Sequence, residues 1–422
     1  MDSGRRVVVT GMGAVSPMAP TAPGTWDGMK AGRIAIRKIQ SYDSTKHKVH
    51  IAAEVDDFGL DKYMSPKDAR RLDRYAQFAL VSAGEALADA GIEFETDGEK
   101  RRVKGLDAER IGVIIGTGVG GMREFEEQTY RLMEKGPGRV SPLLIPKLMP
   151  NAAAGNVAIF WGLKGLSYSA STACASGAHS IGLGADAIRS GQANIVLAGG
   201  CEAPITRVGV AGFENLGALS SNNDPLRASR PFDKDRDGFV IAEGAAVLVL
   251  EEYEHAKARG ANIRAEFLGY GFTSDAYHIT APDETGDGPA RAIRLSMQAA
   301  GVSADEIDYI NAHGTSTLYN DKIETLSIKK ALGEERAHKV PVSSIKSMIG
   351  HSLGAAGAIE AVVCCYALQE GVLPPTMNYV TPDPDCDLDY VPNEAREADV
   401  KVVLSTSLGF GGHNACLAFR RI

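Results

Sequence analysis

The chain of 422 residues lacks the features that define several large classes of protein. It has no uninterrupted apolar run approaching the ~20 residues that a membrane-spanning helix needs. Its N-terminal segment, MDSGRR followed by three valines, lacks the long apolar stretch of a signal peptide. We therefore expect no membrane association and a cytoplasmic location.

Paired cysteines and excess positive charge are also missing. The cysteines show neither CxxC pairs nor clustering with histidine, so we expect reduced thiols and no bound metal. There are six of them: Cys174, Cys201, Cys364, Cys365, Cys386 and Cys416. A net charge of -8 argues against a general nucleic-acid partner. A hydrophobic content of 44% and a charged content of 23% are ordinary for a globular protein.

Short strand-like runs alternate with helical ones along the whole chain. The strand-like runs cover residues 7–9, 112–115, 195–197, 246–250, 309–310 and 402–404. The helical runs cover residues of about 74–90, 123–134, 175–190, 288–300, 321–332 and 354–369. This alternation predicts an α/β fold in which helices cover buried sheets.

A second pattern indicates an internal duplication. The same order of elements occurs twice. In the first part a helix ends at Gly91 and is followed by a charged loop and a strand, and in the second part a helix ending at Gly301 is followed by a similar loop and strand. The loop and helix around Cys174 have a counterpart in residues 343–351 and the small-residue helix that follows. We therefore predict two similar halves, residues 1–262 and 263–422, with the chemistry between them because corresponding loops would meet there.

Cys174 lies where a run of small residues, 171–178, passes into a predicted helix. A thiol at a helix N-terminus faces unpaired backbone N–H groups and the positive end of the helix dipole. Both favour the thiolate, which is the nucleophilic form of cysteine. A buried structural cysteine is the alternative, and this segment alone does not decide between them.

Several chemically active side chains lie in the second half. His313, in the motif NAHGTST, follows a predicted strand, and ligand crevices in open α/β sheets lie beyond the carboxyl ends of strands. Lys346 and His351 lie on a polar loop that enters a helix, and taken singly such charges favour a solvated face. Phe410 stands among glycines that permit close backbone approach, as an oxyanion hole, a gate or a tight turn requires.

Residues 116–121, GTGVGG, satisfy the G-x-G-x-x-G pattern by count. A dinucleotide site also needs a second strand that ends in an acidic residue about 20 positions further on. Here a helical run and the Gly/Pro-rich residues 136–138 follow instead. The sequence therefore argues against nucleotide binding.

Taken together, TACASG, NAHGTST, SSIKSMIGHSLGAAG and GFGG resemble the β-ketoacyl-[acyl-carrier-protein] synthases, most closely the elongating Cys-His-His synthases of type II. The resemblance runs from RVVVTGMGAVSP near the start to GFGGHNA near the end. It implies a thiolase-like fold, two α/β halves in a five-layer αβαβα arrangement, and a homodimer. It also implies an acyl-carrier-protein partner whose phosphopantetheine carries the substrates, with no other cofactor.

The resemblance implies a role for each matching residue. Cys174 would accept an acyl chain, while His313 and His351 would stabilise the enolate left by decarboxylation of the malonyl thioester. Lys346 would order His351. Phe410 would gate the site and, with Cys174, supply the N–H groups of the oxyanion hole.

Other residues would have supporting roles by the same resemblance. They are Asp321 and Glu360 as supporting carboxylates, Thr315 and Thr317 as contacts of the phosphopantetheine arm, and Val119 and Phe213 as lining of the acyl pocket. An acidic carrier protein also requires a basic surface. The basic residues expected to dock it are Lys67, Arg70, Arg71, Arg74 and Arg139, although a solvated helix face is the simpler alternative. Leu318 stands where many relatives have proline.

Related functions remain as alternatives. A ketosynthase of a type II polyketide system would keep the same catalytic set. A chain-length-factor-like subunit, which is not catalytic, would lack the nucleophile that Cys174 provides. Thiolases and initiating synthases replace the second histidine by cysteine or asparagine, whereas this chain has His351. A plain cysteine hydrolase is the weakest alternative, because no feature of the sequence suggests a site built to admit water.

Overall fold

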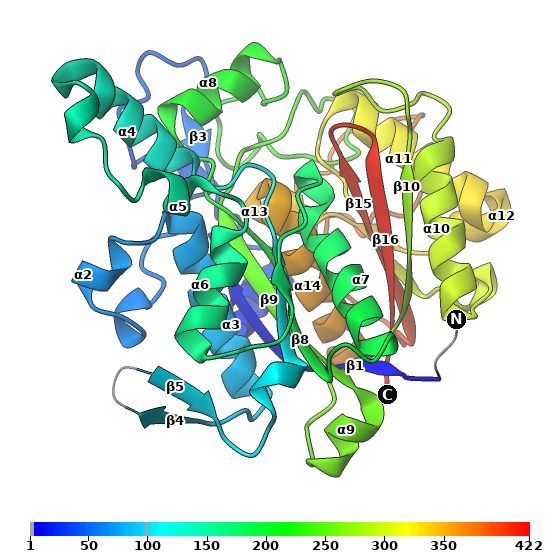
Figure 1. The fold of residues 1–422 in the computed structure, drawn as a ribbon. Helices are drawn as coiled ribbons and strands as arrows, with labels where there is room; N and C mark the ends of the chain where they lie inside the picture. Colours follow the sequence, from blue (N-terminus) through cyan, green and yellow to red (C-terminus); the bar gives the residue numbers. More distant parts are fainter. Residues whose placement is uncertain (1–3, 98–99) are drawn as a thin grey trace.

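The computed structural model describes residues 4–97 and 100–422, in which ten strands form one mixed central sheet (Figure 1). Five of these strands come from the first half of the chain: β1 (Val7–Val15), β6 (Ile111–Gly116), β7 (Ser167–Tyr168), β8 (Ile195–Glu202) and β9 (Gly244–Glu252). Five come from the second half: β10 (Ala265–Ser274), β11 (Tyr309–Asn311), β12 (Val342–Ser343), β15 (Val402–Gly409) and β16 (His413–Arg420).

The two sets of strands have the same topology. From the centre outward their orders are β1-β9-β8-β6-β7 and β10-β16-β15-β11-β12, so each set takes its first, fifth, fourth, second and third strand. β1 and β10 pair antiparallel where the sets meet. Both sets even shift register at the same place, between Val9 and Gly11 and between Phe267 and Gly269. The boundary predicted at 262/263 falls between α9 (Tyr253–Ala258) and β10.

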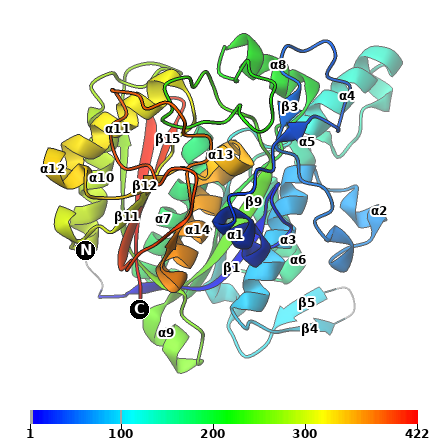
Figure 2. The same ribbon diagram turned by 180° about the vertical axis from the view of Figure 1, so that it is seen from behind.

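The helices divide into three layers around the two sets of strands (Figures 1 and 2). α7 (Ser176–Arg189) and α14 (Ala356–Glu370) pack against strands of both sets. α3 (Arg74–Asp89) and α6 (Ala152–Trp161) cover the outer side of the first set, and α10 (Asp287–Ala300) covers that of the second, backed by α11 (Leu318–Leu332). The predicted five-layer αβαβα arrangement is therefore confirmed.

Further helices and strands lie outside these layers. The helices are α1 (Ala22–Lys30), α2 (Pro66–Ala69), α4 (Met122–Lys135), α5 (Leu144–Leu148), α8 (Arg207–Asn215), α12 (Glu334–Ala337) and α13 (Lys346–Ile349). The strands are β2 (Arg37–Lys38), β3 (Ile51–Ala52), β4 (Phe94–Asp97), β5 (Lys100–Val103), β13 (Val372–Leu373) and β14 (Arg396–Glu397).

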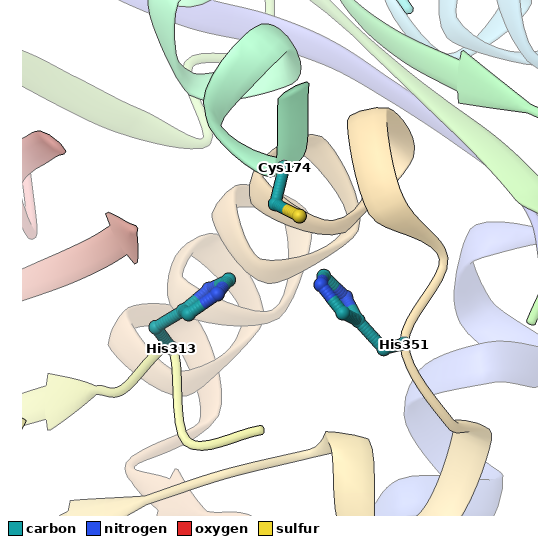
Figure 3. A group of neighbouring side chains, drawn as sticks. All are labelled: Cys174, His313 and His351. Atoms are coloured by element: carbon teal, nitrogen blue, oxygen red, sulfur yellow. The ribbon is translucent and has the colours of Figure 1, made fainter. Parts of the chain in front are cut away.

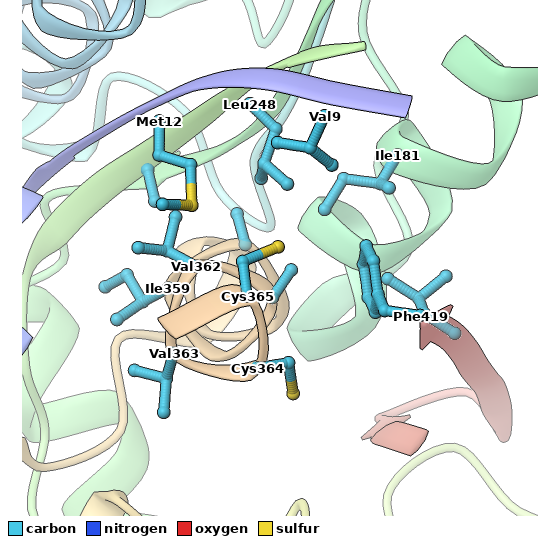
Figure 4. Packing of buried hydrophobic residues seen from close by; sticks show 14 of the residues in the cluster. Val9, Met12, Ile181, Leu248, Ile359, Val362, Val363, Cys364, Cys365 and Phe419 are labelled. Atoms are coloured by element: carbon cyan, nitrogen blue, oxygen red, sulfur yellow. The ribbon is translucent and has the colours of Figure 1, made fainter. Parts of the chain in front are cut away.

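The central core surrounds α14, which is apolar on almost every side (Figure 4). Ile359 and Val362 of this helix pack in one cluster with Val9 of β1 and Phe419 of β16. Residues 353–370 are long and apolar enough to cross a membrane, but 83% of that segment is buried inside the fold. Burial among sheets and helices explains why this helix carries so few polar residues.

Two glycines allow α7 and α14 to approach each other closely. A Cβ atom on Gly177 would lie 2.9 Å from the carbonyl oxygen of Gly354, and one on Gly357 would lie 2.9 Å from the Cβ of Ala178. Real Cβ atoms do not come so near, so only glycine fits. The close crossing brings the first turns of the two helices together.

Most of the predicted segments match the structure, but four strands of the central sheet, β7, β10, β12 and β16, are absent from the prediction. The helices expected at 74–90 and 288–300 correspond to α3 and α10. β10 contains Gly269 and Gly271, which weaken the strand pattern of the sequence. They serve packing, because a Cβ on Gly271 would lie 2.0 Å from the carbonyl oxygen of Ala292 in α10.

Candidate active site

The first turns of α7 and α14 are built alike. Each helix is preceded by a 3₁₀ turn, Ala173–Ala175 and Leu353–Ala355. The first residue of each turn has a positive φ, 50° at Ala173 and 47° at Leu353, which is an uncommon conformation for residues other than glycine. Cys174 is the second residue of the first turn, and Gly354 holds the same position in the second.

Cys174, His313 and His351 converge at one point (Figure 3). His313 follows β11 and His351 follows α13, so the two imidazoles reach the thiol from the second half of the chain. One side-chain nitrogen of each histidine and the sulfur of Cys174 all lie within 4.8 Å of one another. All three residues are buried. The loops predicted to meet between the halves therefore do so.

These residues line a cavity of about 310 Å³. Of the other predicted site residues, Phe213, Thr315, Thr317 and Phe410 line it as well. Val119 is not among the residues that line this cavity in the described chain, and its place in the acyl pocket stays a prediction. Its backbone N–H donates a hydrogen bond to the carboxylate of Glu202.

The surroundings of Cys174 contradict the expectation of a stabilised thiolate. Burial raises the pKa of the thiol to about 12. The charge of Lys346 and hydrogen bonding from the backbone N–H groups of Phe410 and Cys174 lower the pKa, but they offset only part of that effect. The side chain of Cys174 is therefore a thiol in this structure.

The backbone and the ring of His313 are both fixed by buried charged groups. The ammonium of Lys346 lies 2.6 Å from its carbonyl oxygen and 3.4 Å from its Nδ1. An ammonium can only donate hydrogen bonds, so Nδ1 accepts and Nε2 carries the proton of the neutral ring. Burial, with the charge of Lys346, holds the pKa of His313 well below 6.5.

His351 is also neutral. Burial, again with the charge of Lys346, holds its pKa well below the ordinary value of 6.5. Its ring lies edge-on to those of His313 and Phe239, with centroids 5.2 Å apart in both cases. The ammonium of Lys346 bonds to His313 and Glu360 and not to His351, so its effect on His351 is electrostatic, which corrects the prediction that it orders His351.

Glu360 on α14 balances the charge of Lys346. The two side chains form an ion pair that is almost completely buried. Burial raises the pKa of Glu360, and the adjacent ammonium of Lys346 opposes that rise. This pairing fits the supporting role that the resemblance implies for Glu360.

The turn between β15 and β16 brings Phe410 to the cavity. Gly411 and Gly412 have φ values of 85° and 74°, which most other residues rarely adopt. The N–H of Gly411 donates to the carbonyl oxygen of Ile279 at 2.8 Å, so the turn is fastened to the loop that follows β10. The backbone N–H of Phe410 points toward the sulfur of Cys174, as an oxyanion hole would require.

Asp321 supports the loop that carries the two threonines without lining the cavity. Its carboxylate accepts the N–H of Phe232 at 2.7 Å and that of Ser316 at 3.2 Å. Thr315 and Thr317, whose hydroxyls lie 2.9 Å apart, are thereby held facing the cavity.

Two buried carboxylates near the site, Glu324 and Glu202, are absent from the prediction. Glu324 accepts the backbone N–H groups of His313 and Gly314, each at 2.7 Å, and burial raises its pKa to about 7. Glu202 binds the backbone near Cys174 in a comparable way. Glu324 lies three residues after Asp321 on one helix, and that spacing was the available signal.

The basic residues predicted for docking do not share one environment. Lys67, Arg70 and Arg71 are exposed on and after α2, and Arg139 is exposed in the turn after α4. Arg74 is instead bonded to the carboxylate of Glu243, a residue that is 2% exposed, and to the Val55 carbonyl oxygen. This internal pairing contradicts the docking prediction for Arg74.

Comparison with known proteins identifies the family. Models described as beta-ketoacyl synthase, N-terminal domain, and beta-ketoacyl synthase, C-terminal domain, match residues 4–256 and 264–380. The chain belongs to the β-ketoacyl synthases. The resemblance noted in the sequence is thereby confirmed.

Relatives of this synthase match over its whole length. The 3-oxoacyl-[acyl-carrier-protein] synthase 2 of Staphylococcus aureus (strain COL) is 47% identical, covering 100% of this chain and 99% of its own. The protein of the same name from Synechocystis sp. is also 47% identical, over 99% of this chain and 98% of its own.

Solved ketosynthases have the same fold. A beta-ketoacyl synthase from Burkholderia phymatum superposes with a TM-score of 0.90 at 39% identity, over 99% of this chain and 100% of that one. A ketosynthase in complex with its type II PKS acyl-carrier protein gives a TM-score of 0.90 at 38% identity, with the same coverage. These matches confirm the thiolase-like fold.

Proposed function

We propose that this synthase extends acyl chains by two carbons through decarboxylative condensation of malonyl-acyl carrier protein, as a 3-oxoacyl-[acyl-carrier-protein] synthase. The observation that carries the proposal is the convergence of one thiol and two neutral imidazoles in a single cavity. The full-length relatives named 3-oxoacyl-[acyl-carrier-protein] synthase 2 support the same reaction.

The first step transfers the acyl chain to Cys174. Its sulfur attacks the thioester carbonyl carbon of the acyl carrier protein, and the bond from that carbon to the pantetheine sulfur breaks. The proton of the Cys174 thiol leaves with the pantetheine as its new thiol, so the step is balanced without an external base. Before acylation, the high pKa keeps Cys174 as a thiol and limits side reactions of a thiolate. After acylation the sulfur carries no proton, so the pKa no longer matters.

The second step is decarboxylation of the malonyl group. The Nε2–H of His313 and an N–H of His351 donate hydrogen bonds to the malonyl thioester oxygen. The bond between the α-carbon and the carboxylate breaks, and CO2 leaves. The electron pair of that bond stays on the α-carbon and forms the enolate, whose negative charge the two donors stabilise. Neutral imidazoles suit this task, since each keeps an N–H throughout.

Condensation completes the cycle. The enolate carbon attacks the acyl thioester on Cys174, and the backbone N–H groups of Cys174 and Phe410 stabilise the oxygen of the tetrahedral intermediate. The bond to sulfur breaks, and the Cys174 thiolate takes a proton from solvent. The released product is a 3-oxoacyl chain on the carrier protein.

An acyl carrier protein is the proposed macromolecular partner. A structurally similar ketosynthase is known in complex with its type II PKS acyl-carrier protein, which supports this partner. The exposed cations Lys67, Arg70 and Arg71 would attract its acidic surface. α2 lies on the opposite side of the chain from α11 and β10 (Figure 1).

The homodimer is proposed from the family resemblance and from one apolar surface. β7 is the outermost strand of its set, and no other described strand pairs with its outer edge. Exposed apolar side chains lie on α6, which packs against β7, and on α4, among them Ile159 of α6 and Phe125 and Met133 of α4. Such a surface next to an open strand edge is typical of an interface between copies. A cytoplasmic location is proposed with the same enzyme class.

Chain extension in a type II polyketide system is the second candidate. It is favoured by the TM-score of 0.90 to the ketosynthase of such a system, whereas the 47% identity to fatty-acid-type synthases favours the first candidate. The products distinguish the two, because a polyketide synthase repeats the extension without intervening reduction. Cys174 in the cavity argues against a non-catalytic chain-length-factor-like subunit.

The decisive experiment separates the two half-reactions. The Cys174→Ala variant should form no 3-oxoacyl product from acyl- and malonyl-carrier protein, while release of CO2 from malonyl-carrier protein partly survives. Cys365→Ala is a matched control, since Cys365 is a buried cysteine of α14 outside the cavity. Product formation by the Cys174 variant, or no product from the unaltered enzyme, would refute the proposal.

A further inference from the structure

Glu202, the last residue of β8, is a completely buried carboxylate for which the proposed mechanism has no use. It accepts four hydrogen bonds. The donors are the hydroxyl of Thr117 at 2.7 Å and the backbone N–H groups of Gly118 at 2.6 Å, Val119 at 3.1 Å and Gly354 at 2.9 Å. Four donors on one carboxylate form a strong buried anchor.

The donors come from both halves of the chain. Thr117, Gly118 and Val119 belong to the glycine-rich segment 116–121, and Gly354 belongs to the turn before α14. In dinucleotide-binding proteins the backbone of such a segment approaches the phosphates. Here the carboxylate of Glu202 takes the place of a phosphate, so the glycine-rich segment binds a side chain of the protein itself.

The anchor requires glycine on both sides. A Cβ on Gly118 would lie 2.9 Å from Oε2 of Glu202, and one on Gly354 would lie 2.6 Å from the same oxygen. The Cβ on Gly118 would also lie 3.4 Å from the carbonyl oxygen of Ala173, the residue before the nucleophile. The segment held by Glu202 is therefore packed against the turn that carries Cys174.

The second side of the anchor leads to the histidine. Gly354 follows His351 by three residues and occupies the position in its turn that Cys174 occupies in the other. One carboxylate thus holds the backbone beside the nucleophile and the backbone just after His351. Its position helps to fix the distance between these two reacting groups.

The charge of Glu202 also reaches Cys174. It raises the pKa of the thiol, whereas the charge of Lys346 lowers that pKa. The other titratable groups that face the thiol are the two neutral histidines, and those near Glu202 are Cys201 and Tyr75, which are neutral at physiological pH. Burial raises the pKa of Glu202, and its four hydrogen-bond donors oppose that rise. In its charged form Glu202 therefore opposes the charge of Lys346 at this thiol.

We propose that Glu202 is a positioning residue that clamps the two halves together beside Cys174 and His351 and places its carboxylate next to the turn that carries Cys174. The proposal rests on the proposed function for its catalytic consequence. Its effect on the reactivity of the thiol stands independently of any substrate.

The test compares Glu202→Gln and Gly118→Ala with the unaltered enzyme. Glu202→Gln removes the charge and keeps the size, so alkylation of Cys174 by iodoacetamide at pH 8 should become several-fold faster, with its pH profile moved to lower pH. Its condensation rate should fall at least tenfold, because the amide NH2 cannot accept the two hydrogen bonds made to the carboxylate oxygen that it replaces. Gly118→Ala keeps the charge but displaces the carboxylate, so condensation should fall while the alkylation profile stays near its original pH.

Gly155→Ala is the matched control for the added methyl group. A Cβ on Gly155 in α6 would meet no atom within 4 Å, so both readouts should remain unchanged. Thermal unfolding checks that each variant is folded. If Glu202→Gln does not fold, the condensation rate of Gly118→Ala decides whether Glu202 acts as a clamp.

An unchanged condensation rate in a folded Glu202→Gln or Gly118→Ala variant would overturn the clamp. An unchanged alkylation profile in Glu202→Gln would overturn the charge effect. If the unaltered enzyme forms no 3-oxoacyl product, the proposed function fails instead, and the alkylation profiles still decide whether Glu202 controls the thiol.

Discussion

The ammonium group of Lys346 donates a hydrogen bond of 2.6 Å to the carbonyl oxygen of His313. The same group pairs with Glu360 and lies 3.4 Å from the ring nitrogen Nδ1 of His313. One buried cation therefore fixes the tautomer of the histidine, lowers the pKa of the ring and compensates a buried carboxylate. Loss of this cation should affect stability and catalysis separately.

The first prediction concerns this buried pair. Lys346→Met should lower the free energy of unfolding by roughly 3–5 kcal/mol, because removing one partner leaves a buried charge uncompensated. The double variant Lys346→Met, Glu360→Leu should regain most of that stability. Both variants should lack decarboxylation activity, since Nδ1 of His313 loses its donor. Urea denaturation at one protein concentration and CO2 release measure the two effects.

A double variant as unstable as Lys346→Met would contradict the buried ion pair as the source of the loss. Normal decarboxylation in either variant would contradict the role of Lys346 in fixing the tautomer of His313.

The second prediction concerns pH. Because burial holds the pKa values of His313 and His351 well below 6.5, both rings stay neutral, and CO2 release by the Cys174→Ala variant should be constant between about pH 6 and 8. A titration with a midpoint near pH 6.5 in this variant would show that the reacting histidines have ordinary pKa values, contrary to the structure.

The same shift has a consequence for stability. The unfolded chain protonates these histidines at ordinary pKa values while the folded protein does not, so the unfolded state binds more protons below pH 6.5. Stability should then be fully present above pH 6.5 and decline on acidification, by up to about 1.4 kcal/mol per pH unit for each histidine. A His351→Asn variant should show a shallower decline in urea denaturation between pH 6.5 and 5.

The third prediction concerns docking. The triple variant Lys67→Glu, Arg70→Glu, Arg71→Glu should raise the KM for carrier-protein substrates severalfold, because it reverses the charge of the surface that attracts an acidic partner. The kcat and the alkylation rate of Cys174 should remain unchanged, since all three side chains are exposed on or just after α2. Steady-state kinetics with acyl-carrier protein at low salt measures the effect.

A matched control reverses three exposed lysines elsewhere, Lys257, Lys339 and Lys401. It should leave the KM near its original value. Equal increases in KM in the two triple variants would mean that only net charge matters and would remove the docking site.

Local sequence patterns predict only those interactions that form between residues close together along the chain. Helical periodicity located α3 and α10 because their apolar faces repeat within a few residues. β10 was not predicted because Gly269 and Gly271 weaken its strand pattern. These glycines are needed for the close packing of α10 against the strand. Arg74 was misjudged since its partner Glu243 lies 169 residues away, and no local pattern reveals such a pair.

The sequence by itself determined the duplicated α/β organisation, which follows from local periodicity. Its short motifs, through the family resemblance, predicted Cys174, His313 and His351 as the reacting residues. Only the tertiary structure decided the state of these groups. Burial makes Cys174 a thiol and the histidines neutral, and Glu202, Glu324 and Glu360 act on them through contacts that exist only once the two halves have packed together.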